Sequence, residues 1–195
     1  MSTSEFMTKY DEEFLTKMTE AVESNNISFV RQQLESDRDL IHYNEGVGGW
    51  LDAAVDSGHR EMTIMLIEMG CDVNEKCDLG TPLGTAISSD RPDMVQLLLE
   101  HGAKISSDER HVLTCVTSRM NHSLEMVKLL EHHGADLHEV FFNEHNGDNI
   151  NALMMAELFG HSDVEAYLRA KGCVLPEQPE RPSIGKRLKR FFGKE

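Results

Sequence analysis

A thirteen-residue pattern occurs twice in the chain and limits what it can fold into. "DMVQLLLEHGAKI" fills residues 93–105, and "EMVKLLEHHGADL" fills residues 125–137, 32 positions later. The glycine of this pattern recurs with spacings of 32, 32 and 38 residues, at Gly70, Gly102, Gly134 and Gly172. Apolar residues at helical spacing precede each glycine. They are Met62, Leu66, Met69, Val95, Leu98, Leu99, Val127, Leu130, Val164 and Leu168. A period of this length predicts a row of similar units instead of one globular core.

Each unit contains a second, shorter helical segment upstream of the apolar stripe. These segments read "WLDAAVDSGH", "PLGTAISSD", "VLTCVTSRMNH" and "ALMMAELFGH". A unit is therefore predicted to be a short helix, a tight turn, a second helix and a glycine stop, because glycine suits the left-handed backbone that ends a helix. One such helix pair cannot bury its own apolar face, so its stability must come from stacking on its neighbours.

The repeated units resemble the ankyrin repeat. "GTPLGTAISSDRPDMVQLLLEHGAKI" (80–105) is similar to that pattern nearly throughout, and "DAAVDSGHREMTIMLIEMGCDVN" (52–74) is similar to its second half. "SLEMVKLLEHHGADL" (123–137) resembles only the second helix and its stop, whereas residues 151–173 resemble the whole pattern loosely. Residues 14–44 keep the spacing of two short helices without the TPL or GAD signatures.

This resemblance covers about residues 12–175 and implies an all-α ankyrin-repeat solenoid of stacked helix-turn-helix units with projecting finger loops. The expected units are approximately 12–44, 45–76, 77–106, 107–138 and 139–175. Thr81 and Pro82 suit the N-cap and first position of a helix. Ala54, Ala86 and Ala156 recur at one position, where close approach of neighbouring helices is expected, and Val116 takes that position in the fourth unit.

The charge and cysteine content exclude several classes of protein. The chain has 34 acidic and 19 basic residues and a net charge of −15, which disfavours nucleic acid as a partner. No basic start followed by an apolar run indicates a secretory signal, and no apolar run approaches the ~18 residues of a membrane span. The four cysteines form no CxxC pair, which favours a reducing, cytoplasmic location.

The histidines do not indicate a metal or catalytic site. His59 and His161 follow glycine in the turns "SGH" and "FGH", where a turn and capping role is expected. His111 and Cys115 are four residues apart, but two ligands do not complete a zinc site. The chain has no HExxH, no GxSxG and no glycine-rich phosphate loop. We therefore expect a non-enzymatic protein without a metal or cofactor.

The resemblance places a partner-binding surface on the exposed face of the first helices and on the finger loops. The positions before the turn between helices are Asp56, Ser57, Ser88, Ser89, Ser118, Arg119, Glu157 and Leu158. The finger candidates are Glu75, Lys76, Asp78 and Leu79, and residues before the glycine stops, Met69, His101 and His133, are expected to extend the surface.

The fifth unit is interrupted by about six extra residues in "HEVFFNEHNGDNIN". Phe141 and Phe142 stand beside an acidic, turn-forming segment that contains Glu144 and Asp148. Two readings remain open for the phenylalanines, which either pack under the neighbouring finger or contact a partner. For Trp50, the only tryptophan, a place in the core is favoured over an interface anchor.

Residues 176–195 form a separate element, a proline-rich linker followed by a basic tail. They carry six basic and three acidic side chains, a net charge of +3 that leaves −18 on residues 1–175. As a helix, the tail would present Ile184, Leu188, Phe191 and Phe192 on one face and Lys186, Arg187, Lys189 and Arg190 on the rest. The alternatives are a flexible solubilising tail, weak binding to an anionic membrane surface, and docking in a protein groove, for example on the acidic body of its own or another copy.

Together these features predict a protein-binding module, favoured as a monomer, whose partner is a protein with a basic surface. One alternative is a cytoplasmic inhibitor of the immunity or antitoxin type that covers a basic, nucleic-acid-processing enzyme. The other is an adaptor localised to a membrane surface or a partner by its basic C-terminal helix. An inhibitor would block its target's activity stoichiometrically, whereas an adaptor would need the tail and leave that activity intact.

Overall fold

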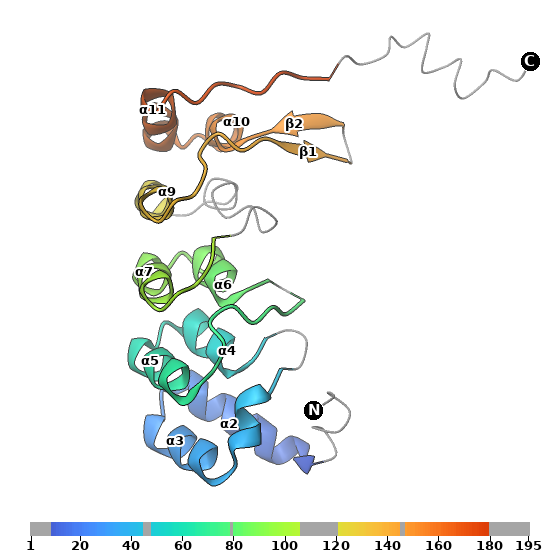
Figure 1. Ribbon diagram of the computed structural model, residues 1–195, viewed down its shortest axis with the longest axis vertical. Coiled ribbons are helices and arrows are strands. Elements are labelled where there is room, and N and C mark those ends of the chain that lie inside the picture. The colour runs from blue at the N-terminus through green and yellow to red at the C-terminus, as the bar shows by residue number, and fades with distance from the viewer. Residues whose placement is uncertain (1–8, 45–47, 79, 106–120, 145–146, 180–195) are drawn as a thin grey trace, which may run out of the picture.

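The computed structural model describes residues 9–44, 48–78, 80–105, 121–144 and 147–179. In these ranges the helices form two parallel columns, and the segments between units project to one side (Figure 1). The first-helix column contains α2 (Glu12–Glu23), α4 (Trp50–Ser57), α6 (Pro82–Ser88) and α10 (Ala152–Phe159). The second-helix column contains α3 (Ile27–Ser36), α5 (Arg60–Met69), α7 (Pro92–Glu100), α9 (Ser123–His132) and α11 (Ser162–Ala170). This arrangement confirms the predicted helix-turn-helix repeats, although the first helix expected before α9 lies outside the described residues.

Local sequence signals begin and end these helices. The Thr81 hydroxyl accepts a hydrogen bond from the amide of Gly84 at 3.4 Å, and Pro82 occupies the first turn of α6. The glycine that ends α5, Gly70, has a positive φ of 111°, and the amide after it bonds back to the carbonyl of Leu66 at 3.0 Å. A short 3₁₀ helix, η1 (Arg38–His42), follows α3 and leads into the first projecting segment.

The core follows the boundary between the two columns and consists mainly of aliphatic and methionine side chains, together with Trp50, Tyr43 and Cys173. Ala54, Ala86 and Ala156 have no exposed surface, which agrees with their expected place at a close helix contact. Trp50 is only 2% exposed, so its predicted place in the core is confirmed. Its indole N–H donates to the carbonyl of Leu40 at 2.7 Å, and its ring stacks on Tyr43 with centroids 3.9 Å apart.

Polar side chains also join successive units. The Asn74 amide donates to the carbonyl of Gly102 at 3.1 Å and accepts from the amide of Lys104 at 2.8 Å. One ring nitrogen of His59 lies 2.7 Å from the carbonyl of Glu23 in the preceding unit. These bonds satisfy backbone groups in the turns, as the predicted structural role of His59 requires.

The projecting segment of the fifth unit is a small β-ribbon, which the all-α prediction did not include. Strand β1 (Phe141–Asn143) pairs antiparallel with β2 (Asp148–Ile150), with Phe141 opposite Ile150. Phe142 is 53% exposed, whereas Phe141 is half-buried. Of the two readings of this pair, packing under a neighbouring finger therefore does not describe Phe142.

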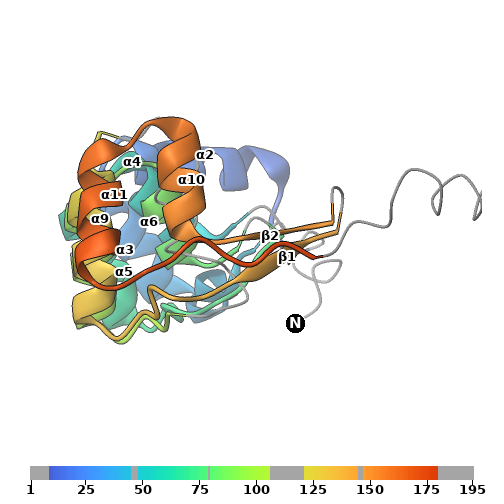
Figure 2. The same ribbon diagram turned by 90° about the horizontal axis from the view of Figure 1, so that it is seen from above.

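The segment that follows α11 runs beside the ribbon in the position of a further projecting segment (Figure 2). The amide of Asn149 donates to the side-chain oxygen of Gln178 at 3.0 Å, and the Gln178 amide group donates to the Asn149 carbonyl at 2.8 Å. The Asn149 side chain also donates to the carbonyl of Glu177 at 2.7 Å. Residues 174–179, which we call the C-terminal strap, are thus tied to β2, so the first residues of the predicted proline-rich linker lie against the ribbon.

Gly58, which ends α4, has a positive φ and also lies close to the side chain of Arg91. Gly58 has a φ of 75°, and a Cβ added there would overlap the guanidinium of Arg91, whose Nε donates to the carbonyl of Asp56 at 2.7 Å. Gly160 ends α10 with a φ of 77°, but an added Cβ would meet nothing within 4 Å. The two turns therefore share the backbone requirement and differ in the arginine contact.

We predict that Gly160→Ala lowers the free energy of unfolding by about 1 kcal/mol, the usual cost of a positive φ. Gly58→Ala should cost about 1 kcal/mol more, because the Arg91 hydrogen bond is also displaced. In an Arg91→Ala background this extra cost should disappear, as urea denaturation followed by circular dichroism can measure. Equal costs of Gly58→Ala in the two backgrounds would show that Arg91 does not contribute.

Glu131 connects α9 to α11 at the end of the stack. It accepts a hydrogen bond from the Tyr167 hydroxyl and pairs with the Lys171 ammonium at 2.7 Å. These interactions, the Lys171 contact first, hold the pKa of the Glu131 carboxyl below its usual value of 4.5. The pairing therefore stabilises the folded chain above the pKa of the unfolded state, and this stabilisation is lost as the pH falls through the lowered value.

Glu131→Gln should accordingly reduce the free energy of unfolding at neutral pH, and the difference from the native chain should vanish in acid. The measurement is urea denaturation at a series of pH values. In a Lys171→Met background the substitution should cost less and depend less on pH, because the principal partner is already absent. An undiminished pH dependence in that background would contradict the assignment to Lys171.

Candidate partner-binding surface

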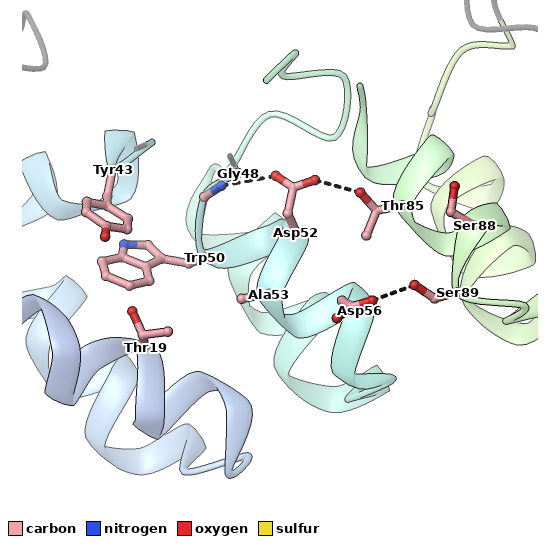
Figure 3. Close-up of a pocket in the computed structure, with 11 residues that line it drawn as sticks. Thr19, Tyr43, Gly48, Trp50, Asp52, Ala53, Asp56, Thr85, Ser88 and Ser89 are labelled. Atoms are coloured by element: carbon pink, nitrogen blue, oxygen red, sulfur yellow. Dashed lines mark hydrogen bonds between the residues drawn. The ribbon is translucent and has the colours of Figure 1, made fainter. Parts of the chain in front are cut away.

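A cavity of about 490 Å³ opens on the first-helix column between α2, α4 and α6 (Figure 3). It lies where the projecting segments join the helices, because Tyr43, Gly48 and Gly49, which precede α4, form part of its wall. The described residues that line this acidic cavity are Thr19, Tyr43, Gly48, Gly49, Trp50, Asp52, Ala53, Asp56, Thr85, Ser88 and Ser89. Three successive units therefore contribute to one site.

The cavity combines an apolar side with a polar one. The apolar side consists of the half-buried Ala53 and of Tyr43 and Trp50, whose stacked rings are only 6% and 2% exposed. Hydroxyl groups of Thr19, Thr85, Ser88 and Ser89 and the carboxylates of Asp52 and Asp56 supply the polar side. Such a mixture orients a ligand through a few polar groups while burying its apolar part.

Asp52 is the buried carboxylate of the site. It is only 9% exposed, and its two oxygens accept from the amide of Gly49 at 3.1 Å and from the Thr85 hydroxyl at 3.3 Å. Burial raises the pKa of this carboxyl above its usual 3.8, and the two hydrogen bonds oppose that rise. Asp52 thus closes the first turn of α4 and links α4 to the next unit.

Asp56 is the exposed carboxylate, one turn further along α4. It accepts a hydrogen bond from the Ser89 hydroxyl of the next unit (Figure 3). None of the described residues that line the cavity carries a basic side chain. The arrangement therefore favours a cationic ligand, although the Arg91 guanidinium, outside the lining, donates to the backbone carbonyl of Asp56 at 2.7 Å.

The residues predicted before the inter-helix turns divide between the cavity and α10. Asp56, Ser88 and Ser89 line the cavity, and Ser57 is half-buried at the end of α4. Glu157 and Leu158 lie near the end of α10, higher in the stack, where Leu158 is 70% exposed. Glu157 forms an ion pair with Arg169 of α11, so its charge is partly neutralised within the chain.

The predicted finger residues lie on the projecting segments. Glu75, Lys76 and Asp78 belong to the segment between α5 and α6, which a reciprocal backbone pair between Cys77 and Gly80 closes. Phe141, Phe142, Glu144 and Asp148 belong to the ribbon or its turn. The structure therefore brings both finger groups to the side of the molecule on which the cavity opens.

The structure does not bring the residues before the glycine stops to this side. Met69 ends α5, and His101 and His133 cap α7 and α9, so all three belong to the second-helix column. His101 is engaged locally, with Nδ1 2.8 Å from the carbonyl of Leu97. Leu79, Ser118, Arg119 and the predicted tail residues from Ile184 to Phe192 lie outside the described residues.

Sequence reasoning did not single out several wall residues of the cavity: Thr19, Tyr43, Gly48, Gly49, Asp52, Ala53 and Thr85. One signal was available, because Asp52 and Thr85, like Asp56 and Ser89, are 33 residues apart, close to the repeat period. Polar residues at that separation on the first helices meet across the stack.

In the part of the chain that the structure describes, no group of three or more His, Cys, Asp or Glu side chains is placed to hold a metal ion. Nor does any helix in these ranges have the length and apolar character needed to cross a bilayer.

Comparison with known proteins identifies part of the stack. The model of a family described as ankyrin repeats (three copies) matches residues 18–109, which include every described residue that lines the acidic cavity. A search of curated proteins found no match.

Asp52 leads to a prediction about pH. Because its pKa is raised in the folded chain, the folded state binds the proton more tightly than the unfolded state, so stability falls as the pH rises from about 3.8 through the raised value. Asp52→Asn removes this titration, and the variant should become more stable relative to the native chain across that window.

Urea denaturation at several pH values measures the difference. Thr85→Val provides a second variant, because it removes a hydrogen bond that lowers the Asp52 pKa and should widen the window. A difference between Asp52→Asn and the native chain that does not change with pH would contradict the assignment.

Proposed function

Residues 18–109 of this chain are ankyrin repeats, a protein-interaction module, and we propose that the module binds a protein with a basic surface. The proposed contact surface comprises the acidic cavity and the adjoining projecting segments. The observation that carries the proposal is the lining of the cavity, where two carboxylates and five hydroxyl-bearing residues stand without a basic side chain among the described residues.

The acidic character continues from the cavity onto α2. A second hollow on that helix is lined by Glu12, Glu13, Thr16, Lys17 and Glu20. Its single cation, Lys17, lies over the ring of Phe29, 5.4 Å from the centroid. A basic partner would therefore meet carboxylates on α2 as well as on α4, in keeping with the net charge of −15 for the whole chain.

The two carboxylates of the cavity have different roles in this proposal. Asp56 is exposed and can pair with a lysine or arginine of the partner, whose aliphatic part would cover Ala53 and the edge of Trp50. Asp52 links α4 to α6 through its hydrogen bond with Thr85, and its buried carboxylate adds negative potential to the cavity. Complementary charge of this kind steers association and makes its rate depend on salt.

The chemistry of the described residues supports binding in preference to catalysis. Both oxygens of Asp52 already accept structural hydrogen bonds, so it is poorly placed to act as a general base. Burial, the largest cause, raises the pKa of the Cys71 thiol to about 12, which keeps it in the unreactive protonated form at neutral pH.

Charge reversal at Asp56 tests the proposal. Affinity capture with the native chain should recover basic proteins at low salt and lose most of them at high salt. Asp56→Lys should weaken their binding by about tenfold or more, because it places like charges together at the centre of the contact. Glu61→Lys makes the same charge change at an exposed position of α5 in the other column and should retain the partners.

Circular dichroism of both variants controls for folding. The proposal fails if the recovered proteins are acidic, if their binding is indifferent to salt, or if Asp56→Lys and Glu61→Lys behave alike.

A further inference from the structure

We propose that the acidic cavity is a docking site for the chain's own basic tail, residues 180–195, which competes there with the partner. The inference rests on the proposed function in one respect, because it takes the same surface to be the binding surface. It goes further by naming an occupant and by making the free protein self-inhibited. Three observations support it: where the tail begins, how far it reaches and what it carries.

The C-terminal strap determines where the tail begins. Three hydrogen bonds tie Glu177 and Gln178 to Asn149 of β2, and the Asn151 side chain donates to the carbonyl of Val174 at 2.8 Å. The strap therefore follows the ribbon away from the helices, on the side from which all projecting segments leave (Figure 2). The acidic cavity opens on this side too, since the residues preceding α4 form its wall.

The tail is long enough to reach the cavity. Helix layers pack about 8–10 Å apart, so two to three layers between α10 and the α4–α6 pair amount to roughly 20–30 Å. The basic group at residues 186–190 stands 7–11 residues beyond the strap, which an extended chain spans in about 25–35 Å. The strap ends beyond the three-residue strands of the ribbon, which lengthens the path by about 10 Å. Lys189, Arg190 and Lys194 stand 10–15 residues beyond the strap, a reach of about 33–50 Å, and can therefore meet the cavity without displacing the strap.

The tail and the cavity are chemically complementary. Residues 180–195 contain six basic and two acidic side chains, whereas the cavity presents Asp52 and Asp56 and no basic residue among its described lining. The tail interleaves its cations with Leu188, Phe191 and Phe192, and the cavity has an apolar side formed by Tyr43, Trp50 and Ala53. A short tether also gives the tail an effective concentration on the order of 1 mM, so a weak contact would be populated.

The test uses a fluorescent synthetic peptide with the sequence of residues 180–195 as the probe, and full-length proteins as receptors. The key variant neutralises the tail with Lys186→Gln, Arg187→Gln, Lys189→Gln and Arg190→Gln, which leaves the helical stack unchanged. The native chain should bind the peptide about tenfold more weakly than this variant, because its own tail fills the site; this factor is expected for a Kd of roughly 0.1 mM against a tethered tail near 1 mM.

A second substitution in the tail-neutral background locates the site. Asp56→Lys should reduce peptide binding by about tenfold, whereas Glu61→Lys should leave it unchanged. Equal affinity of the native and tail-neutral chains would overturn docking in cis. Absence of peptide binding to both would overturn the cavity as the site for this segment. Binding that Asp56→Lys does not weaken would do the same.

The rival occupants give distinct results. If the tail docks on a second copy, the difference between native and tail-neutral chains grows with protein concentration and a dimer sediments, which overturns docking in cis. If the tail binds membranes instead, the native chain floats with phosphatidylserine vesicles, the tail-neutral chain does not, and both bind the peptide equally. If Asp56→Lys weakens partner capture but leaves peptide binding unchanged, the proposed function stands and this inference is rejected.

Discussion

The stack depends on the burial of an apolar face that no helix pair can cover by itself. Each unit gains its core from the next, and small side chains let the first helices approach closely enough for this to happen. Ala54, Ala86 and Ala156 have no exposed surface, and Trp50 joins α4 to the preceding segment by stacking on Tyr43. A larger side chain at the alanine positions would push neighbouring units apart and would weaken every contact between them.

Stacking at a constant period also assembles the acidic cavity. Residues about one repeat apart in sequence come side by side, so Thr85 reaches Asp52 and Ser89 reaches Asp56. No single unit contains the site, because its walls come from α2, α4 and α6. The packing of the repeated helices determines where the carboxylates lie. The side chains that differ between units determine the chemistry of the surface. Stability and specificity are thus carried by different positions of the same helices.

Within the described residues, the unit of α10 and α11 packs on a neighbour on one side only, and polar contacts hold it there. Glu131 joins α9 to Tyr167 and Lys171 of α11, and the C-terminal strap lies where the projecting segment of a further unit would lie. Large exposed apolar side chains within the described residues all belong to this unit or the strap: Val140, Phe142, Leu158, Phe159, Val174 and Leu175. The end of the stack is therefore the part with the most apolar surface left for a partner.

Helical periodicity and capping are encoded within one unit, so the sequence alone predicted the helix pairs, their glycine stops, the buried alanines and the resemblance to ankyrin repeats. By that resemblance, Asp56, Ser88 and Ser89 were also placed among the proposed binding residues. Only the tertiary structure decided that Asp52 and Thr85 belong to the same site, that Met69, His101 and His133 lie in the other column, and that Gln178 ties the strap to β2. These facts depend on which side chains meet across units, and such long-range contacts leave little trace in a local pattern.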